Sequence, residues 1–186
     1  MARINVIPYE QAEGELKSIY DDLIQKRGKL SQVLMIQSLH PETIKSHTQL
    51  YLDLMFAQSP LTRAERELIA TVVSVANGCN YCQVHHSTAL NAYWKDQQRI
   101  NTLLTDYNSA SLTRKEIAMC DFAIQLTKKP GEHEKGSFTD TLKDIGLDDR
   151  SILDLVLVIS YFNFVNRTVL ALGVQLEEDK GEGYKY

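Results

Sequence analysis

The residues best able to do chemistry lie together in one short segment, Cys79-Asn80-Tyr81-Cys82-Gln83-Val84-His85-His86. If this segment opens a helix, His86 lies one turn beyond Cys82 on the same face. Unpaired N–H groups at a helix N-terminus stabilise a thiolate, and a nearby imidazole can accept the thiol proton. One cysteine could then act as a nucleophile near neutral pH, while the other resolves its sulfenic acid into a disulfide. The spacing therefore predicts redox chemistry.

Two other interpretations of these residues stay open. Free cysteines are among the most buried residue types, so Cys79 and Cys82 could simply be small core residues. Zinc is the second alternative, because the two thiolates and either His85 or His86 would supply three ligands. No further C-x-x-C or H-x-x-H pair follows, and Cys120 lies far along the chain. A closed four-ligand site lacks its fourth member, so no metal is expected.

A carboxylate precedes this segment at a distinctive spacing. Glu67 is followed by eleven residues and then by C-x-x-C-x-x-x-H, which begins at Cys79. This register resembles the alkylhydroperoxidase D branch of the carboxymuconolactone decarboxylase superfamily. Residues 161–167 and the following Leu170-Ala171-Leu172-Gly173-Val174 also look like the peroxidase-related proteins of that branch, so the resemblance spans most of the chain.

The resemblance implies an all-α fold in which a dithiol reduces hydroperoxides. It places Cys82 at the peroxidatic position and Cys79 at the resolving, partner-facing position. It also implies that Glu67, Cys82 and His86 form a proton relay. No cofactor is implied, and an external dithiol or a thioredoxin-like protein would restore the reduced cysteines.

Tyr81 departs from the family pattern, because the characterised peroxidases carry a second relay histidine between the cysteines. Tyrosine can donate or accept a hydrogen bond, but with a pKa near 10 it shuttles protons poorly at neutral pH. His85 does not simply replace that histidine, since a helix rotates it by about 100° from His86. Tyr81 and His85 are therefore auxiliary candidates.

Three classes of function follow from these residues. A thiol-dependent alkyl hydroperoxidase or dithiol–disulfide oxidoreductase is favoured. A non-enzymatic redox sensor or stress-linked interaction protein could use the same disulfide as a conformational switch. A lyase of the carboxymuconolactone decarboxylase type is less favoured, because that branch works without a cysteine pair.

Local signals predict the helices that position these residues. Thr62 and Glu65 form a capping box, which starts a helix that carries Glu67. The pair Asn77-Gly78 suits a left-handed helix end, and a new helix then opens near Cys79. We therefore expect Glu67 and the cysteines on two consecutive helices.

A second capping box occurs at Thr113 and Glu116, and its flanks match those of the first. Residues 110–116 read Ala-Ser-Leu-Thr-Arg-Lys-Glu, against Ser-Pro-Leu-Thr-Arg-Ala-Glu at 59–65. A weak internal helical duplication is one interpretation and chance is the other, because capping boxes are common.

Apolar residues at helical spacing predict the remaining elements. No segment alternates like a convincing strand, so we expect one all-α domain over residues 1–186, an alkylhydroperoxidase D-like helical bundle. Further helices are expected at 10–27 before Gly28, after Pro41, at 138–145, and at 149–172 after the cap Asp148.

Composition limits the partners and the compartment. The chain has 186 residues and a formal net charge of −4, which favours neither nucleic acid nor an anionic membrane. An odd number of cysteines and an N-terminus without the apolar core of a signal peptide indicate the reducing cytosol. The uncharged stretch at 155–166 is 12 residues long, shorter than the ~20 that a membrane span needs.

The last long helix and the tail that follows it lead to two further expectations. The tail at 177–186 is charged and contains glycine, so we expect it to be flexible. The helix at 149–172 is apolar on nearly all faces, which predicts burial against another subunit. The resemblance implies a homo-oligomer built from dimers or trimers, commonly a hexamer.

Overall fold

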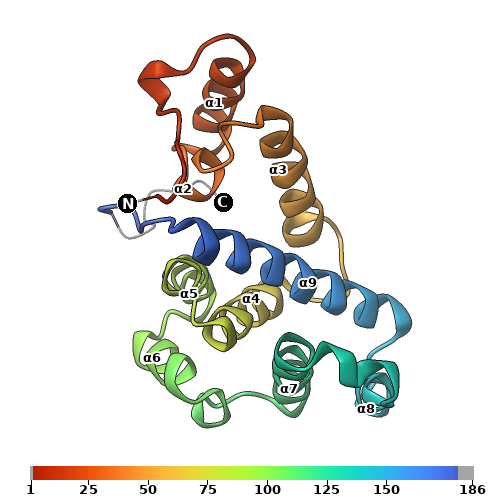
Figure 1. The fold of residues 1–186 in the computed structure, drawn as a ribbon. Coiled ribbons are helices and arrows are strands. Elements are labelled where there is room, and N and C mark those ends of the chain that lie inside the picture. The colour runs from red at the N-terminus through yellow and green to blue at the C-terminus, as the bar shows by residue number, and fades with distance from the viewer. Residues whose placement is uncertain (1, 180–186) are drawn as a thin grey trace.

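The structure, a computed structural model, describes residues 2–179. Within that range the chain is all-helical and has no β-strand, as predicted (Figure 1). Short 3-10 turns occur at Tyr9–Gln11, Tyr107–Ser109 and Pro130–Glu134. The α-helices are α1 (Gly14–Arg27), α2 (Gln32–Met35), α3 (Pro41–Phe56), α4 (Arg63–Asn77), α5 (Asn80–Trp94), α6 (Gln97–Thr105), α7 (Arg114–Lys128), α8 (Phe138–Asp144) and α9 (Asp149–Leu172).

Helix α4 is the centre of the larger hydrophobic core and packs against α5, α7 and α9 (Figure 1). Its start is the predicted capping box, in which the Thr62 hydroxyl accepts from the N–H of Glu65 while the Glu65 carboxylate accepts from the N–H of Thr62. The second predicted box starts α7 in the same way, and Lys115 of α7 lies 2.7 Å from a carboxylate oxygen of Glu65. The two boxes therefore hold the starts of neighbouring helices together.

The turn from α4 into α5 places the cysteines. Gly78 adopts the left-handed conformation with φ 68°, which a residue with a Cβ rarely adopts. The N–H of Cys79 then donates to the carbonyl of Ser74 at 3.0 Å, and the carbonyl of Cys79 accepts from the N–H of Gln83 at 2.9 Å. Cys79 is thus the residue immediately before α5, and Cys82 lies in the first turn of that helix.

Helices α1, α2 and α3 form a second, smaller core on the other side of α9 from α4 and α5 (Figure 1). Tyr20 and Ile44 are its fully buried members. Helix α1 ends at Arg27, before the left-handed Gly28, and α3 begins at Pro41, both as predicted. The predicted start of α1 at residue 10 is wrong, because residues 9–11 form a separate 3-10 turn and α1 begins at Gly14. The four-residue α2 was not predicted, because so short an element shows no periodicity in sequence.

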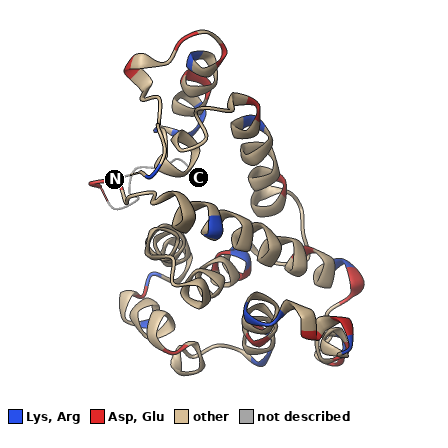
Figure 2. Cartoon of the chain, in the orientation of Figure 1, with Lys and Arg blue, Asp and Glu red and all other residues tan. Residues whose placement is uncertain are grey.

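Helix α9 lies between the two cores and serves both. By length and composition it is the only helix of the described residues that could cross a membrane, but Leu155, Ile159 and Phe162 are core residues with almost no exposed surface. It carries no charged side chain between Asp154 and Arg167, whereas charges are frequent on α1, α7 and α8 (Figure 2). Its apolar sequence therefore builds the interior of the fold.

The segment after α9 differs from the expected flexible tail at its first residues. Glu177 makes three hydrogen bonds to other parts of the chain, and Asp179 pairs with Lys29 at 2.7 Å. Residues 180–186 of the expected tail lie outside the described residues.

Candidate redox site

The two cysteines of α5 face each other. Their Sγ atoms are 2.9 Å apart, and both cysteines are free. Cys79 is completely buried, and Cys82 retains only 2% of its surface. Two reduced sulfurs at this separation are hydrogen-bonded and need little movement to form a disulfide.

The hydrogen bond between the sulfurs makes the pKa values of the two thiols differ. It lowers the pKa of Cys79, and the backbone of Cys82 acts in the same direction. The same hydrogen bond, followed by burial, raises the pKa of Cys82. When the dithiol loses one proton, the charge is therefore favoured on Cys79, at the N-terminal end of α5, where the helix dipole stabilises it.

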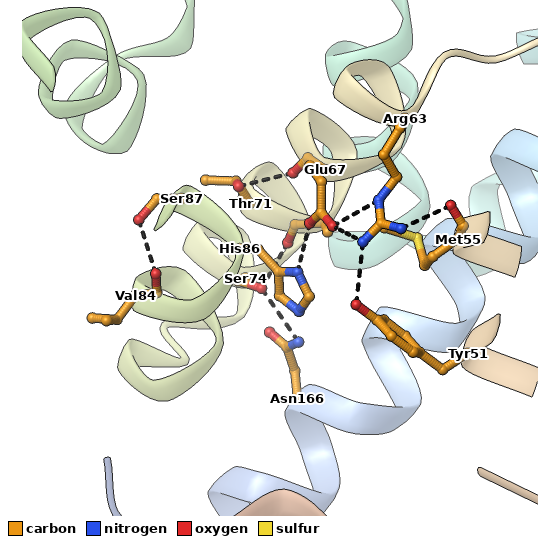
Figure 3. Close-up of polar contacts among 11 residues, drawn as sticks. Tyr51, Met55, Arg63, Glu67, Thr71, Ser74, Val84, His86, Ser87 and Asn166 are labelled. Atoms are coloured by element: carbon orange, nitrogen blue, oxygen red, sulfur yellow. Dashed lines mark hydrogen bonds and ion pairs between the residues drawn. The ribbon is translucent and has the colours of Figure 1, made fainter. Parts of the chain in front are cut away.

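A buried carboxylate of α4, that of Glu67, contacts the cysteine helix. Glu67 has no exposed surface, and its Oε2 atom is 2.8 Å from Nδ1 of His86 (Figure 3). Burial by itself would raise the pKa of Glu67, but His86 and Arg63 together hold it below its usual value. Glu67 is therefore an ionised acceptor that orients the His86 ring.

Arg63 completes this arrangement, and the sequence analysis did not single it out. Its Nε and Nη2 atoms donate to Oε1 of Glu67 at 3.0 and 2.5 Å. Its other donors reach the carbonyl of Met55 at 3.1 Å and the hydroxyl of Tyr51 at 3.3 Å (Figure 3). The i, i+4 spacing of Arg63 and Glu67 is a signal that could have found this pair.

A second carboxylate, that of Glu177, also contacts the cysteine helix. Glu177 accepts hydrogen bonds from the Tyr81 hydroxyl at 2.8 Å and from the N–H of Gln32 at 2.9 Å. Its Oε2 atom is 2.8 Å from Nε2 of His85, whose ring lies against that of Tyr81 with 4.4 Å between centroids. Burial by itself would raise the pKa of Glu177. The hydrogen bonds from His85 and Gln32 outweigh this effect and lower the pKa to about 2.

A partly open cavity of about 90 Å³ adjoins the site. Cys82 lines it and Cys79 does not, so a small molecule would meet Cys82 first. His47 of α3 also lines it, and burial lowers the pKa of His47 to about 4, which leaves its ring neutral near pH 7. The lining residues are Arg27, Ser31, Val33, Leu34, His47, Thr48, Tyr51, Tyr81, Cys82, His85, His86, Ala89, Tyr161, Phe162 and Val165.

The predicted site residues thus come together in two groups. Glu67 and His86 form one hydrogen-bonded pair, and Tyr81 and His85 form another group with Glu177. The third cysteine, Cys120, is buried on α7. Among residues 2–179, no three histidine, cysteine or acidic side chains gather as they would around a metal ion.

Part of the chain matches a known protein family. The sequence pattern of the carboxymuconolactone decarboxylase family matches residues 41–125, which include Glu67 and the cysteine helix. The uncharacterized protein YdfG of Bacillus subtilis (strain 168) is 26% identical over 144 residues, which cover 77% of this chain and 96% of YdfG.

Two crystal structures share almost the whole fold. One is an uncharacterized peroxidase-related protein from Silicibacter sp. TM1040, with a TM-score of 0.85 and 29% identity over 99% of this chain and 96% of that chain. The other is a peroxidase-related protein from Ralstonia eutropha JMP134, described as an alkylhydroperoxidase AhpD core, with a TM-score of 0.84 and 24% identity over 99% and 98% of the two chains. Residues 41–125 of this chain match the carboxymuconolactone decarboxylase family, and the chain has the alkylhydroperoxidase D-like fold.

Proposed function

We propose that the protein is a thiol-dependent peroxidase, or more generally a dithiol–disulfide oxidoreductase. The observation that carries the proposal is the 2.9 Å contact between the sulfurs of Cys79 and Cys82, beside a cavity that also contains His86. The peroxidase-related names of the structural relatives support the same class of reaction. The reducing cytosol, which keeps thiols reduced, is the compartment that suits such a protein.

Cys82 is the attacking residue in this proposal, because its sulfur lines the cavity. His86, held by Glu67, takes the first proton of the dithiol. The remaining proton passes from Cys82 to Cys79 across the contact between the sulfurs, which puts the thiolate where a substrate can reach it. The lowered pKa of Cys79 thus makes the first deprotonation easier, and the proton transfer that follows forms the Cys82 thiolate.

The chemical steps balance without a cofactor. The Cys82 thiolate attacks the outer oxygen of a hydroperoxide ROOH, so that an S–O bond forms, the O–O bond breaks and RO⁻ leaves to become ROH. Cys79 then attacks the sulfenic acid sulfur, an S–S bond forms and water leaves. An external dithiol or a thioredoxin-like protein reduces this disulfide by exchange and is itself oxidised.

The test is steady-state consumption of an organic hydroperoxide in the presence of a dithiol. We expect many turnovers per protein chain, and none above the uncatalysed rate with Cys82→Ser. Cys120→Ala is the matched control, because Cys120 is buried on another helix, and it should keep full activity. A single oxidation without further turnover would instead support a redox sensor that uses the same disulfide.

A further inference from the structure

Two imidazole–carboxylate pairs face one cavity. In the first, Nδ1 of His86 is 2.8 Å from Glu67; in the second, Nε2 of His85 is 2.8 Å from Glu177. Both histidines line the cavity together with Cys82. The proposed mechanism gives a role to Glu67 and His86 but none to His85 and Glu177.

The second pair is built into the fold. The side chains of His85 and Glu177 are each only 12% exposed, although the two residues are 92 positions apart in sequence. Tyr81 and the backbone of Gln32 hold the Glu177 carboxylate in place from two further directions. An ionised carboxylate only accepts hydrogen bonds, so the hydrogen between the pair belongs to Nε2 of His85.

Reduction of a hydroperoxide requires two proton transfers at different places. The attacking thiol must lose a proton, and the departing RO⁻ must gain one, since an alkoxide is a poor leaving group at neutral pH. A carboxylate that holds one nitrogen of an imidazole fixes the ring and stabilises its protonated form, as in serine hydrolases. The first pair suits the removal of the thiol proton. Of the other two histidines on the cavity wall, His47 is neutral near pH 7 and only His85 is paired with a carboxylate.

We propose that His85 is a second catalytic residue, which protonates the leaving oxygen, and that Glu177 is its positioning residue. This inference rests on the proposed peroxidase function. In the step concerned, the Cys82 thiolate, ROOH and the imidazolium of His85 give the Cys82 sulfenic acid, ROH and neutral His85. The thiol proton of Cys79 leaves in the water formed with the disulfide, and a thiol proton of the external reductant restores the imidazolium.

The experiment compares two oxidants that make the same sulfenic acid but differ in leaving group. tert-Butyl hydroperoxide releases an alkoxide, which needs a proton, whereas peracetic acid releases a stable carboxylate, which does not. His85→Gln keeps an N–H group for Glu177 but cannot act as an acid. Loss of thiols in a single turnover is followed by rapid quenching and alkylation, and alkylation by iodoacetamide alone reports how readily the thiolate forms.

We expect His85→Gln to slow the reaction with tert-butyl hydroperoxide by a factor of about 100 or more, the usual range of general acid catalysis. Its reactions with peracetic acid and iodoacetamide should keep the wild-type rates. Glu177→Gln should show the same selectivity to a smaller extent, whereas His86→Ala should slow all three reactions. His40→Gln is the matched control, because His40 is exposed and outside the site.

Two results would overturn the role of His85 and leave the proposed function standing. One is an unchanged rate of His85→Gln with tert-butyl hydroperoxide. The other is an equal slowing of all three reactions by this variant, which would mark a structural role. If the wild-type protein reacts with neither oxidant but is alkylated normally, the proposed function itself fails, and the role of His85 fails with it.

Discussion

The carboxylate of Glu67 lies entirely inside the protein, with its Oε2 atom 2.8 Å from Nδ1 of His86. On its other side, Arg63 donates two hydrogen bonds to Oε1. A buried charge in this position is tolerated because both oxygens are paired. The hydrogen bond between Glu67 and His86 links α4, at the centre of the fold, to α5, which carries the cysteines.

Removal of this charge should affect both stability and reactivity. Glu67→Gln leaves Arg63 buried without its counter-charge, so we expect the free energy of unfolding to fall by about 3 kcal/mol. Alkylation of the cysteines near neutral pH should also become slower, because His86 loses the group that orients it. Urea unfolding and iodoacetamide kinetics measure the two effects. The exposed Glu10→Gln is the control, and equal behaviour of the two variants would contradict the buried pair.

The two cysteines should fail in different ways when each is replaced. Cys82→Ser should not react with peroxide, because the sulfur that lines the cavity is gone. Cys79→Ser should still be oxidised once, to a sulfenic acid that a dimedone-type reagent traps, but it should not be recycled by a dithiol. Mass spectrometry distinguishes these products. A trapped sulfenic acid on Cys79 in the Cys82→Ser protein would reverse the assigned roles.

Glu177 should contribute stability that is lost in acid. Its pKa in the folded protein is about 2, below the ordinary value of 4.5, so the contribution is complete above about pH 4.5 and disappears as the pH falls toward 2. By linkage it amounts to about 3 kcal/mol. The gap in unfolding free energy between wild type and Glu177→Gln, measured by urea titration, should therefore narrow on acidification. A gap that is independent of pH would rule out an ionised, hydrogen-bonded Glu177.

The short-range signals of the sequence predicted the elements that matter most for the site. The capping box at Thr62 and the left-handed Gly78 act within a few residues, and they place Glu67 on α4 and both cysteines at the start of α5. The pairing of Glu67 with His86 follows once these helices pack side by side. Local sequence signals were therefore enough to predict where Glu67, His86 and the two cysteines lie in the fold.

The remaining half depends on contacts between distant segments. Glu177 looked like part of a charged tail, because nothing near it in sequence shows that Tyr81 and His85 are its partners. The cavity likewise requires α3 and the segment around α2 to pack against α5 and α9. Such features arise from tertiary packing, which periodicity and capping signals do not report.

The structure shows which exposed apolar residues are available for the interface of the homo-oligomer expected from the sequence. Eleven of the 24 residues of α9 are buried within the chain, which explains part of its apolar character without a partner. Leu153, Leu157 and Phe164 of α9 nevertheless remain 40% to 53% exposed, and Leu50, Leu52 and Phe56 of α3 remain 37% to 46% exposed. We propose that this surface contacts another copy in a homo-oligomer. Light scattering at micromolar concentration should give a multiple of 21.1 kDa, and a mass of one chain would contradict the proposal.

The most direct test of the redox site is the fate of its thiols after one equivalent of organic hydroperoxide. Thiol titration of the fully reduced protein should show the loss of two of the three cysteine thiols, and peptide mapping should find a disulfide between Cys79 and Cys82. Cys120 should stay reduced, because burial raises the pKa of its thiol. If all three thiols survive, or if oxidation falls on Cys120 instead, the contact between Cys79 and Cys82 is not a peroxide-reducing dithiol.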